Sequence, residues 1–103
     1  MTEPPVPDLE REAVRVADRL RLLGPRWAAR QHAPDAASVD AVRTTLQRLA
    51  DLAADADAAP RRPVPPLALH ALADQVLVLA REAARAGATD AAHDALVVLR
   101  HSL

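Results

Sequence analysis

The 103-residue sequence contains no cysteine, lysine, isoleucine, asparagine, phenylalanine or tyrosine, and its only methionine is the first residue. The lack of cysteine excludes disulfides, thiolate chemistry and any zinc site that uses cysteine ligands. All 13 cationic residues are arginine, and most of the missing types have AT-rich codons, so we interpret the bias as that of a bacterial genome of high GC content. The arginine content is therefore weak evidence for phosphate binding.

Glycine and long apolar runs are also scarce. Two glycines are too few for a phosphate-binding Gly-rich loop, and no apolar run approaches the ~18 residues that a membrane span needs. Residues 1–7 lack the basic stretch and the apolar core of a signal peptide. The net charge of −1 gives no global field that would attract nucleic acid or an anionic membrane. We expect a cytoplasmic protein with no membrane association and no cofactor.

Small and aliphatic residues make up nearly all of the apolar half of the chain: 25 Ala, 15 Leu and 10 Val, with a single Trp. Ala and Leu favour helices, whereas strands favour β-branched and aromatic residues. A chain of this length fits one domain. The composition predicts an all-α fold, at least about 65% helical: a small bundle of three long helices, a short Trp-bearing helical turn and a shorter C-terminal helix.

The prolines and the apolar spacing place the first elements. Residues 1–7 are predicted to be a flexible proline-rich arm, followed by a single helical domain over residues 8–103. Asp8 can cap the first helix, and the Gly24-Pro25 pair is expected to end it. Pro25 then starts a short turn that carries Trp27. The apolar face of this helix consists of Leu9, Ala13, Val16, Leu20 and Leu23.

A second amphipathic helix is predicted from a cap at Asp35 or Ser38 to about residue 55 or 57. Its apolar side consists of Val39, Val42, Leu46, Leu49 and Ala53. Residues 58–66 form a proline-rich connection that can be neither a helix nor a central strand. About ten extended residues span ~30 Å, the length of a 20-residue helix. The connection can therefore cross the bundle and leave its flanking helices parallel, or turn back between antiparallel helices; both arrangements stay open.

The third long helix is predicted from about Pro66 to Gly87, the residue type expected just past a helix end. Its apolar arc covers about half of the circumference, so it should have neighbours on two sides and be the central helix of the bundle. Thr89 is expected to cap the last helix, which runs to the C-terminus.

Catalytic and metal-binding constellations are not evident. The histidines His70, His93 and His101 lie near aspartates, but they fall on polar helix faces and lack the spacing of a metal-binding helix motif. Glu82 shares its face with Arg81 and Arg85, which is typical of a solvated helix surface. We therefore predict that the chain is not an enzyme.

An arginine stripe on the first helix is the candidate site for an anionic partner: Arg11, Arg15, Arg19, Arg26 and Arg30. Such a stripe can contact phosphate or an acidic protein surface. Glu12 and Asp18 border it at pairing distance along the helix, so a solvated, internally neutralised face is the favoured interpretation, and nucleic-acid binding the alternative.

Apolar residues outside the main stripes suggest a second buried surface, because a small domain without aromatic bulk has a thin core. The candidate interface residues are Val14, Leu22, Trp27, Leu52, Val78 and Val97. Trp27 fits either the end of the core or an interface. The preferred function is a non-catalytic interaction, scaffold or regulatory module, self-associating as a homodimer or binding a partner protein. A nucleic-acid-binding regulator and an accessory subunit or ligand carrier with an internal cavity are the alternatives.

Overall fold

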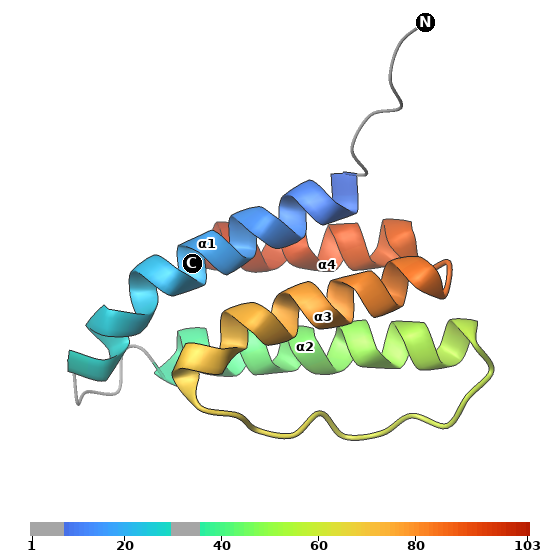
Figure 1. The fold of residues 1–103 in the computed structure, drawn as a ribbon, viewed down its shortest axis with the longest axis horizontal. Helices are drawn as coiled ribbons and strands as arrows, with labels where there is room; N and C mark the ends of the chain where they lie inside the picture. Colours follow the sequence, from blue (N-terminus) through green and yellow to red (C-terminus); the bar gives the residue numbers. More distant parts are fainter. Residues whose placement is uncertain (1–7, 30–35) are drawn as a thin grey trace, which may run out of the picture.

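The computed structural model describes residues 8–29 and 36–103, with side chains over residues 8–24 and 37–103. Within these ranges it contains four α-helices, α1 (Asp8–Ala29), α2 (Ala36–Ala56), α3 (Leu72–Arg85) and α4 (Thr89–Ser102), a short 3₁₀ turn η2 (Leu69–Ala71), and no strand (Figure 1). The helices alone cover more than two-thirds of the 103 residues. The predicted all-α fold is confirmed.

The connection between α2 and η2 crosses the bundle, which decides between the two arrangements that the sequence left open. It leaves the end of α2, returns along the length of that helix and enters η2 at the opposite end of the bundle (Figure 1). As a result α2 and α3 point the same way, while α1 and α3 are antiparallel (Figure 1). Both α1 and α2 pack against α3 and against α4, so α3 has neighbours on two sides, as predicted.

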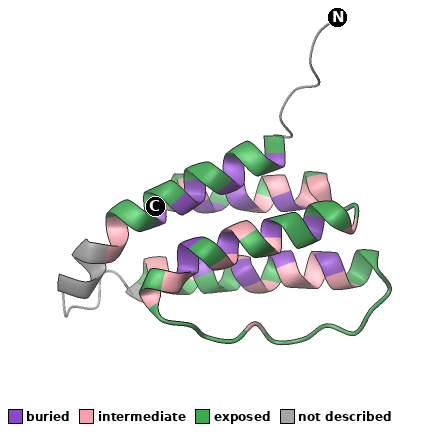
Figure 2. Cartoon of the chain, viewed as in Figure 1, coloured by how far each residue is buried: buried purple, intermediate pink, exposed green. Residues whose placement is uncertain are grey.

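Among the described residues the apolar core consists of leucine, valine and alanine, it follows the predicted stripes of the first two helices, and one charged residue, Glu12, is buried with it (Figure 2). Leu9, Ala13, Val16 and Leu20 are buried on α1, as are Val42, Leu46, Leu49 and Ala53 on α2 and Leu72, Val76 and Ala83 on α3. Leu23 and Val39, at the ends of their stripes, are half-buried. Leu69 and Leu79, expected at the centre of the apolar arc of the third helix, are also only half-buried, whereas Ala73 and Ala80, expected on its flank, are buried. Helix periodicity found the buried faces of α1 and α2 because each helix buries one face.

The predicted break at Gly24-Pro25 is wrong, because α1 continues without interruption to Ala29. A proline φ of about −65° is a helix value, so Pro25 is compatible with a helix at the loss of one backbone hydrogen bond. There is consequently no separate turn bearing Trp27, which lies in the last part of α1. The structure does not describe the side chains of Arg26 and Trp27. Arg30 and the predicted arm over residues 1–7 lie outside the described residues.

The third helix begins later than predicted. Residues up to Ala68 are extended, with φ −61° and ψ 156° at Ala68, and α3 starts at Leu72 after η2. The prolines at 63, 65 and 66 hold the preceding residues extended and delay the helix. The bundle therefore has two long helices of 22 and 21 residues and two of 14, in place of three long helices and one shorter.

The turn between α3 and α4 contains one confirmed prediction and one error. Gly87, with φ +91°, follows the end of α3, and the amide of Ala88 donates to the carbonyl of Ala83 at 2.9 Å, which is a Schellman motif. Thr89 does not cap α4: the capping position is Ala88, and no side chain makes a cap hydrogen bond. The tight Schellman turn places Ala88 at the capping position and Thr89 already inside the helix.

Candidate interaction surface

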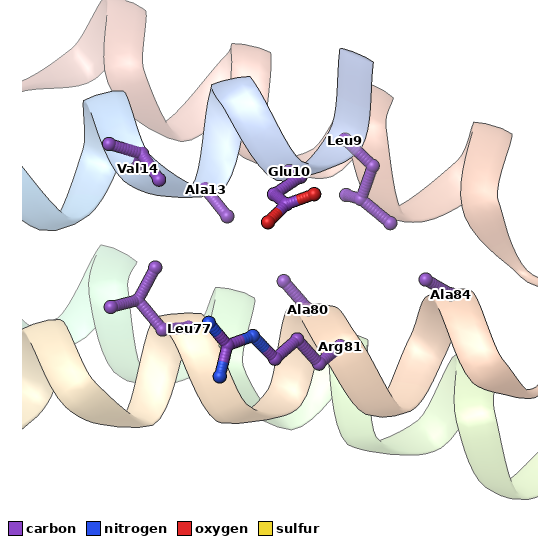
Figure 3. Close-up of a pocket in the computed structure, with 8 residues that line it drawn as sticks. All are labelled: Leu9, Glu10, Ala13, Val14, Leu77, Ala80, Arg81 and Ala84. Atoms are coloured by element: carbon purple, nitrogen blue, oxygen red, sulfur yellow. The ribbon is translucent and has the colours of Figure 1, made fainter. Parts of the chain in front are cut away.

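An apolar groove lies along the seam between α1 and α3, with a volume of about 180 Å³ (Figure 3). We call it the seam groove; it is lined by Leu9, Glu10, Ala13 and Val14 of α1 and by Leu77, Ala80, Arg81 and Ala84 of α3. The three alanines are too small to fill the space between the antiparallel helices, which leaves the groove open to solvent.

Opposite charges stand on the two sides of the seam groove. Glu10 projects from α1 and Arg81 from α3, at about the same level along the groove (Figure 3). Within the described part of the chain neither side chain takes part in an ion pair, whereas Arg15, Arg21 and Arg85 each pair with an acid. The groove is therefore an apolar channel with an anion and a cation at its rims that form no ion pair with any described residue.

A second apolar groove lies on the other side of α3, beneath the connection over residues 57–68, which we call the strap. This strap groove has a volume of about 570 Å³. It is lined by Ala50, Arg62, Pro63, Val64, Pro65, Leu67, Ala71, Asp74, Gln75, Val78 and Leu79. Among the described residues, the Oε1 atom of Gln75 is buried without a hydrogen-bond partner, so a donor on a bound molecule would satisfy it.

Polar side chains of the helices hold the strap through its backbone. Gln47 of α2 donates to the carbonyl of Arg62 at 3.0 Å and accepts from the amide of Val64 at 2.9 Å, as a neighbouring strand would. Gln75 of α3 donates to the carbonyl of Pro65 at 3.2 Å. Arg43 of α2 donates to the carbonyl of Leu67 at 3.1 Å. These bonds fix the position of the prolines and so the shape of the strap groove.

An exposed ion pair fastens the start of the strap. Arg61 contacts both carboxylate oxygens of Asp55, with Nε–Oδ1 3.0 Å and Nη2–Oδ2 2.7 Å. This hydrogen bonding, more than the charge of Arg61 alone, lowers the pKa of Asp55 below its usual value. A similar exposed cluster joins the ends of α2 and α3, where Arg85 pairs with Glu82 at 2.8 Å and Asp57 at 3.4 Å, and these contacts raise the pKa of Arg85.

Large exposed apolar side chains gather around α3. Val14 (44% exposed) lines the seam groove, while Leu67 (44%) and Val78 (57%) line the strap groove. We call the surface formed by the two grooves and the outer side of α3 the α3 face. The outer side of α3 also exposes charged residues, Asp74, Arg81, Glu82 and Arg85, so the apolar surface lies in the two grooves and these charges border it. Apolar surface with a polar rim is typical of protein-interaction sites.

The other candidate interface residues lie elsewhere. Leu22 is 69% exposed on α1, outside the residues that line either groove. Leu52 is half-buried against the core, and Val97 is half-buried on α4, so neither is a free surface residue. Arg100, three residues after Val97 on α4, reaches the buried carboxylate of Glu12 on α1.

Two exposed apolar residues were missed by the sequence analysis, Leu67 and Val98 (71% exposed). Leu67 was assigned to the third helix, and only the extended strap turns it outward. Val98 was overlooked beside Val97 because the orientation of α4 against its neighbours was not known.

The arginine stripe is partly engaged within the chain. Arg11, Arg15 and Arg19 are exposed on α1, but Arg15 pairs with Glu12 at 3.5 Å and Arg19 donates to the backbone oxygen of Leu103 at 3.2 Å. Asp18 pairs with Arg21 at 3.3 Å and not with a member of the stripe. The geometry therefore supplies no assembled row of free guanidinium groups over the part of the stripe that is described.

No cluster of three or more His, Asp or Glu side chains in residues 8–24 and 37–103 is arranged to hold a metal ion. His93 lies 3.7 Å from Asp94, and His70 and His101 are exposed. None of the helices in the described ranges is long and apolar enough to span a membrane.

Comparison of the chain with protein-family models, with curated proteins and with solved structures finds no match.

Proposed function

We propose that the chain is a non-catalytic protein-interaction module that associates with itself through the α3 face. The observation that carries this proposal is the gathering of Val14, Leu67 and Val78 around α3, where two apolar grooves flank one helix. Buried apolar area is the main favourable contribution to association, and a two-fold dimer is the commonest assembly that covers such a face.

An interface of ordinary size would cover a small part of this chain. A specific interface covers about 800 Å² on each partner. The chain exposes 6726 Å² in total, so a contact of that size would take roughly one-eighth of its surface. The α3 face spans two neighbouring grooves and the helix between them, whereas Leu22 and Val98 are exposed singly on other helices.

The test is the mass of the protein as a function of concentration, by analytical ultracentrifugation. We expect a monomer–dimer equilibrium for the wild-type chain. The double variant Val14→Glu/Val78→Glu is expected to be monomeric, because each substitution places a carboxylate in the apolar contact.

The matched control is Leu22→Glu/Val98→Glu, which adds the same two charges at side chains that are even more exposed but line neither groove. It is expected to associate like the wild type. A wild-type chain that remains monomeric at every concentration would contradict self-association. Loss of the dimer only in the control variant would place the interface away from the α3 face.

A further inference from the structure

We propose that the seam groove binds a second copy of this chain about a two-fold axis parallel to the groove, with Glu10 of each copy paired to Arg81 of the other. This inference rests on the proposed function, since it requires self-association, and it names the contact that orients the two copies.

The antiparallel course of α1 and α3 makes the groove self-complementary. A two-fold axis along the groove places α1 of one copy opposite α3 of the other and preserves the level of each residue along the axis. Because Glu10 and Arg81 project at the same level from opposite sides of the groove, each then faces its opposite charge in the second copy (Figure 3). The helices that meet across the axis are again antiparallel, which is favourable for their dipoles.

The floor and walls of the groove suit a helix of this same chain. Exposed Ala84 lets a facing helix approach closely, and exposed Val14 and half-buried Leu77 supply apolar bulk above a floor formed by buried Ala13 and Ala80. About this axis Val14 of one copy meets Leu77 of the other, because both lie at the same level of the groove (Figure 3). The contact across the axis is therefore apolar on both sides.

The unpaired charges argue for a second copy over an unrelated occupant. In the described part of the monomer Glu10 and Arg81 make no ion pair, although they line one groove. A two-fold dimer forms two Glu10–Arg81 ion pairs between the copies, so both charges of each copy are paired without any other molecule. Charge pairs of this kind orient an interface and raise its specificity.

Charge exchange gives a sharp test, with native mass spectrometry as the readout. Glu10→Arg places two like-charged arginine pairs in the dimer, and Arg81→Glu places two glutamate pairs there. Each variant alone is expected to raise the dissociation constant by about tenfold or more. An equimolar mixture of the two variants restores both opposite-charge pairs, and so does the double variant Glu10→Arg/Arg81→Glu. Both are expected to recover the dimer.

The mixture decides between contact in the dimer and contact within one chain. A Glu10–Arg81 pair inside one monomer would be rebuilt in the double variant but not in the mixture. Recovery of a heterodimer in the mixture therefore supports the proposed contact, and its absence overturns it. Circular dichroism of each variant checks that these solvent-facing substitutions leave the helices folded.

The outcome also separates this inference from the proposed function. If the wild type dimerises and the charge variants dimerise equally well, the seam-groove contact is wrong while self-association stands. If Val78→Glu alone abolishes that dimer, the strap groove is the interface. A wild-type chain that is monomeric at every concentration overturns both.

Discussion

Glu12 of α1 and Arg100 of α4 form an ion pair whose carboxylate is almost completely buried, with Glu12 2% exposed. The guanidinium of Arg100 is partly exposed, and Arg15 contacts the other carboxylate oxygen of Glu12. A buried carboxylate requires such partners, because its removal from water costs several kcal/mol. The pair therefore ties α1 to α4 and favours one register between them.

Loss of Arg100 is predicted to destabilise the fold markedly. Arg100→Ala leaves Glu12 buried with Arg15 alone, at an expected cost of about 2 to 3 kcal/mol in the free energy of unfolding, measured by urea denaturation. Arg15→Ala removes the more exposed partner and should cost less than about 1 kcal/mol. Equal effects of the two substitutions would show that the Arg100 contact has no special weight.

Glu12 also shows how far the sequence determined the fold. It lies three residues after Leu9 and four before Val16, on the apolar face of α1, and this position was the signal that it is buried. From the sequence alone, Glu12 was interpreted as an acid that borders the arginine stripe. A single polar residue inside an apolar stripe identifies a buried pair, but its partner on α4 depends on how two helices are placed against each other.

Features set by local sequence were predictable, whereas surface features that depend on the placement of distant elements were not. The core stripes of α1 and α2 and the turn at Gly87 follow from local spacing and backbone preference, and they were predicted correctly. Neither groove was predictable, since each lies between elements distant in sequence: α1 with α3, and the strap with α3. Val14 and Val78 were found as off-stripe residues, whereas Leu67 was missed because its exposure depends on the strap.

Ala58 is predicted to carry backbone strain. It follows the end of α2 in the left-handed region, with φ 53°, where a side chain is unfavourable. Ala58→Gly should stabilise the protein by about 1 kcal/mol and raise its melting temperature by about 4–8 °C in a calorimetric scan. Gly87→Ala, at φ +91°, should have the opposite effect. A lower melting temperature for Ala58→Gly would contradict the strain at this turn.

The Asp55–Arg61 pair predicts a pH dependence. Hydrogen bonding by Arg61 holds the pKa of Asp55 below its value in the unfolded chain. The pair therefore stabilises the fold above the usual carboxyl pKa, and this contribution is lost as the pH falls through the lowered pKa of Asp55. Carboxyl NMR titration should show the pKa of Asp55 rising in Arg61→Ala. The neighbouring Arg62→Ala should leave it unchanged, and a rise of equal size there would refute the specific contact.

The arginine stripe is predicted not to bind nucleic acid at physiological salt. Arg15 and Arg19 are already engaged by Glu12 and by the backbone of Leu103, and the net charge is −1. A gel-shift titration with duplex DNA and RNA should show no complex. If a salt-sensitive complex forms in the micromolar range, and Arg15→Ala/Arg19→Ala reduces its salt dependence, the nucleic-acid-binding alternative is to be preferred.

The two hydrogen bonds between Gln47 and the strap predict a local effect on hydrogen exchange. The side-chain oxygen of Gln47 accepts the amide of Val64, and its nitrogen donates to the carbonyl of Arg62. Gln47→Ala should remove both bonds to the strap and a third bond, to Asp51 Oδ1 at 2.8 Å, destabilise the protein by about 1 to 2 kcal/mol and greatly accelerate hydrogen exchange at the Val64 amide.

Gln47→Glu is the informative control, because a carboxylate still accepts from Val64 but can donate neither to Arg62 nor to Asp51, whose carboxylate then repels it. It should retain most of the amide protection while losing part of the stability. Gln75→Ala removes a donor to the carbonyl of Pro65 and leaves the Val64 amide bonded, so exchange at Val64 should stay slow. Rapid exchange at Val64 in the wild-type protein would mean that the strap is not held by Gln47, and the strap groove would then lose its fixed wall.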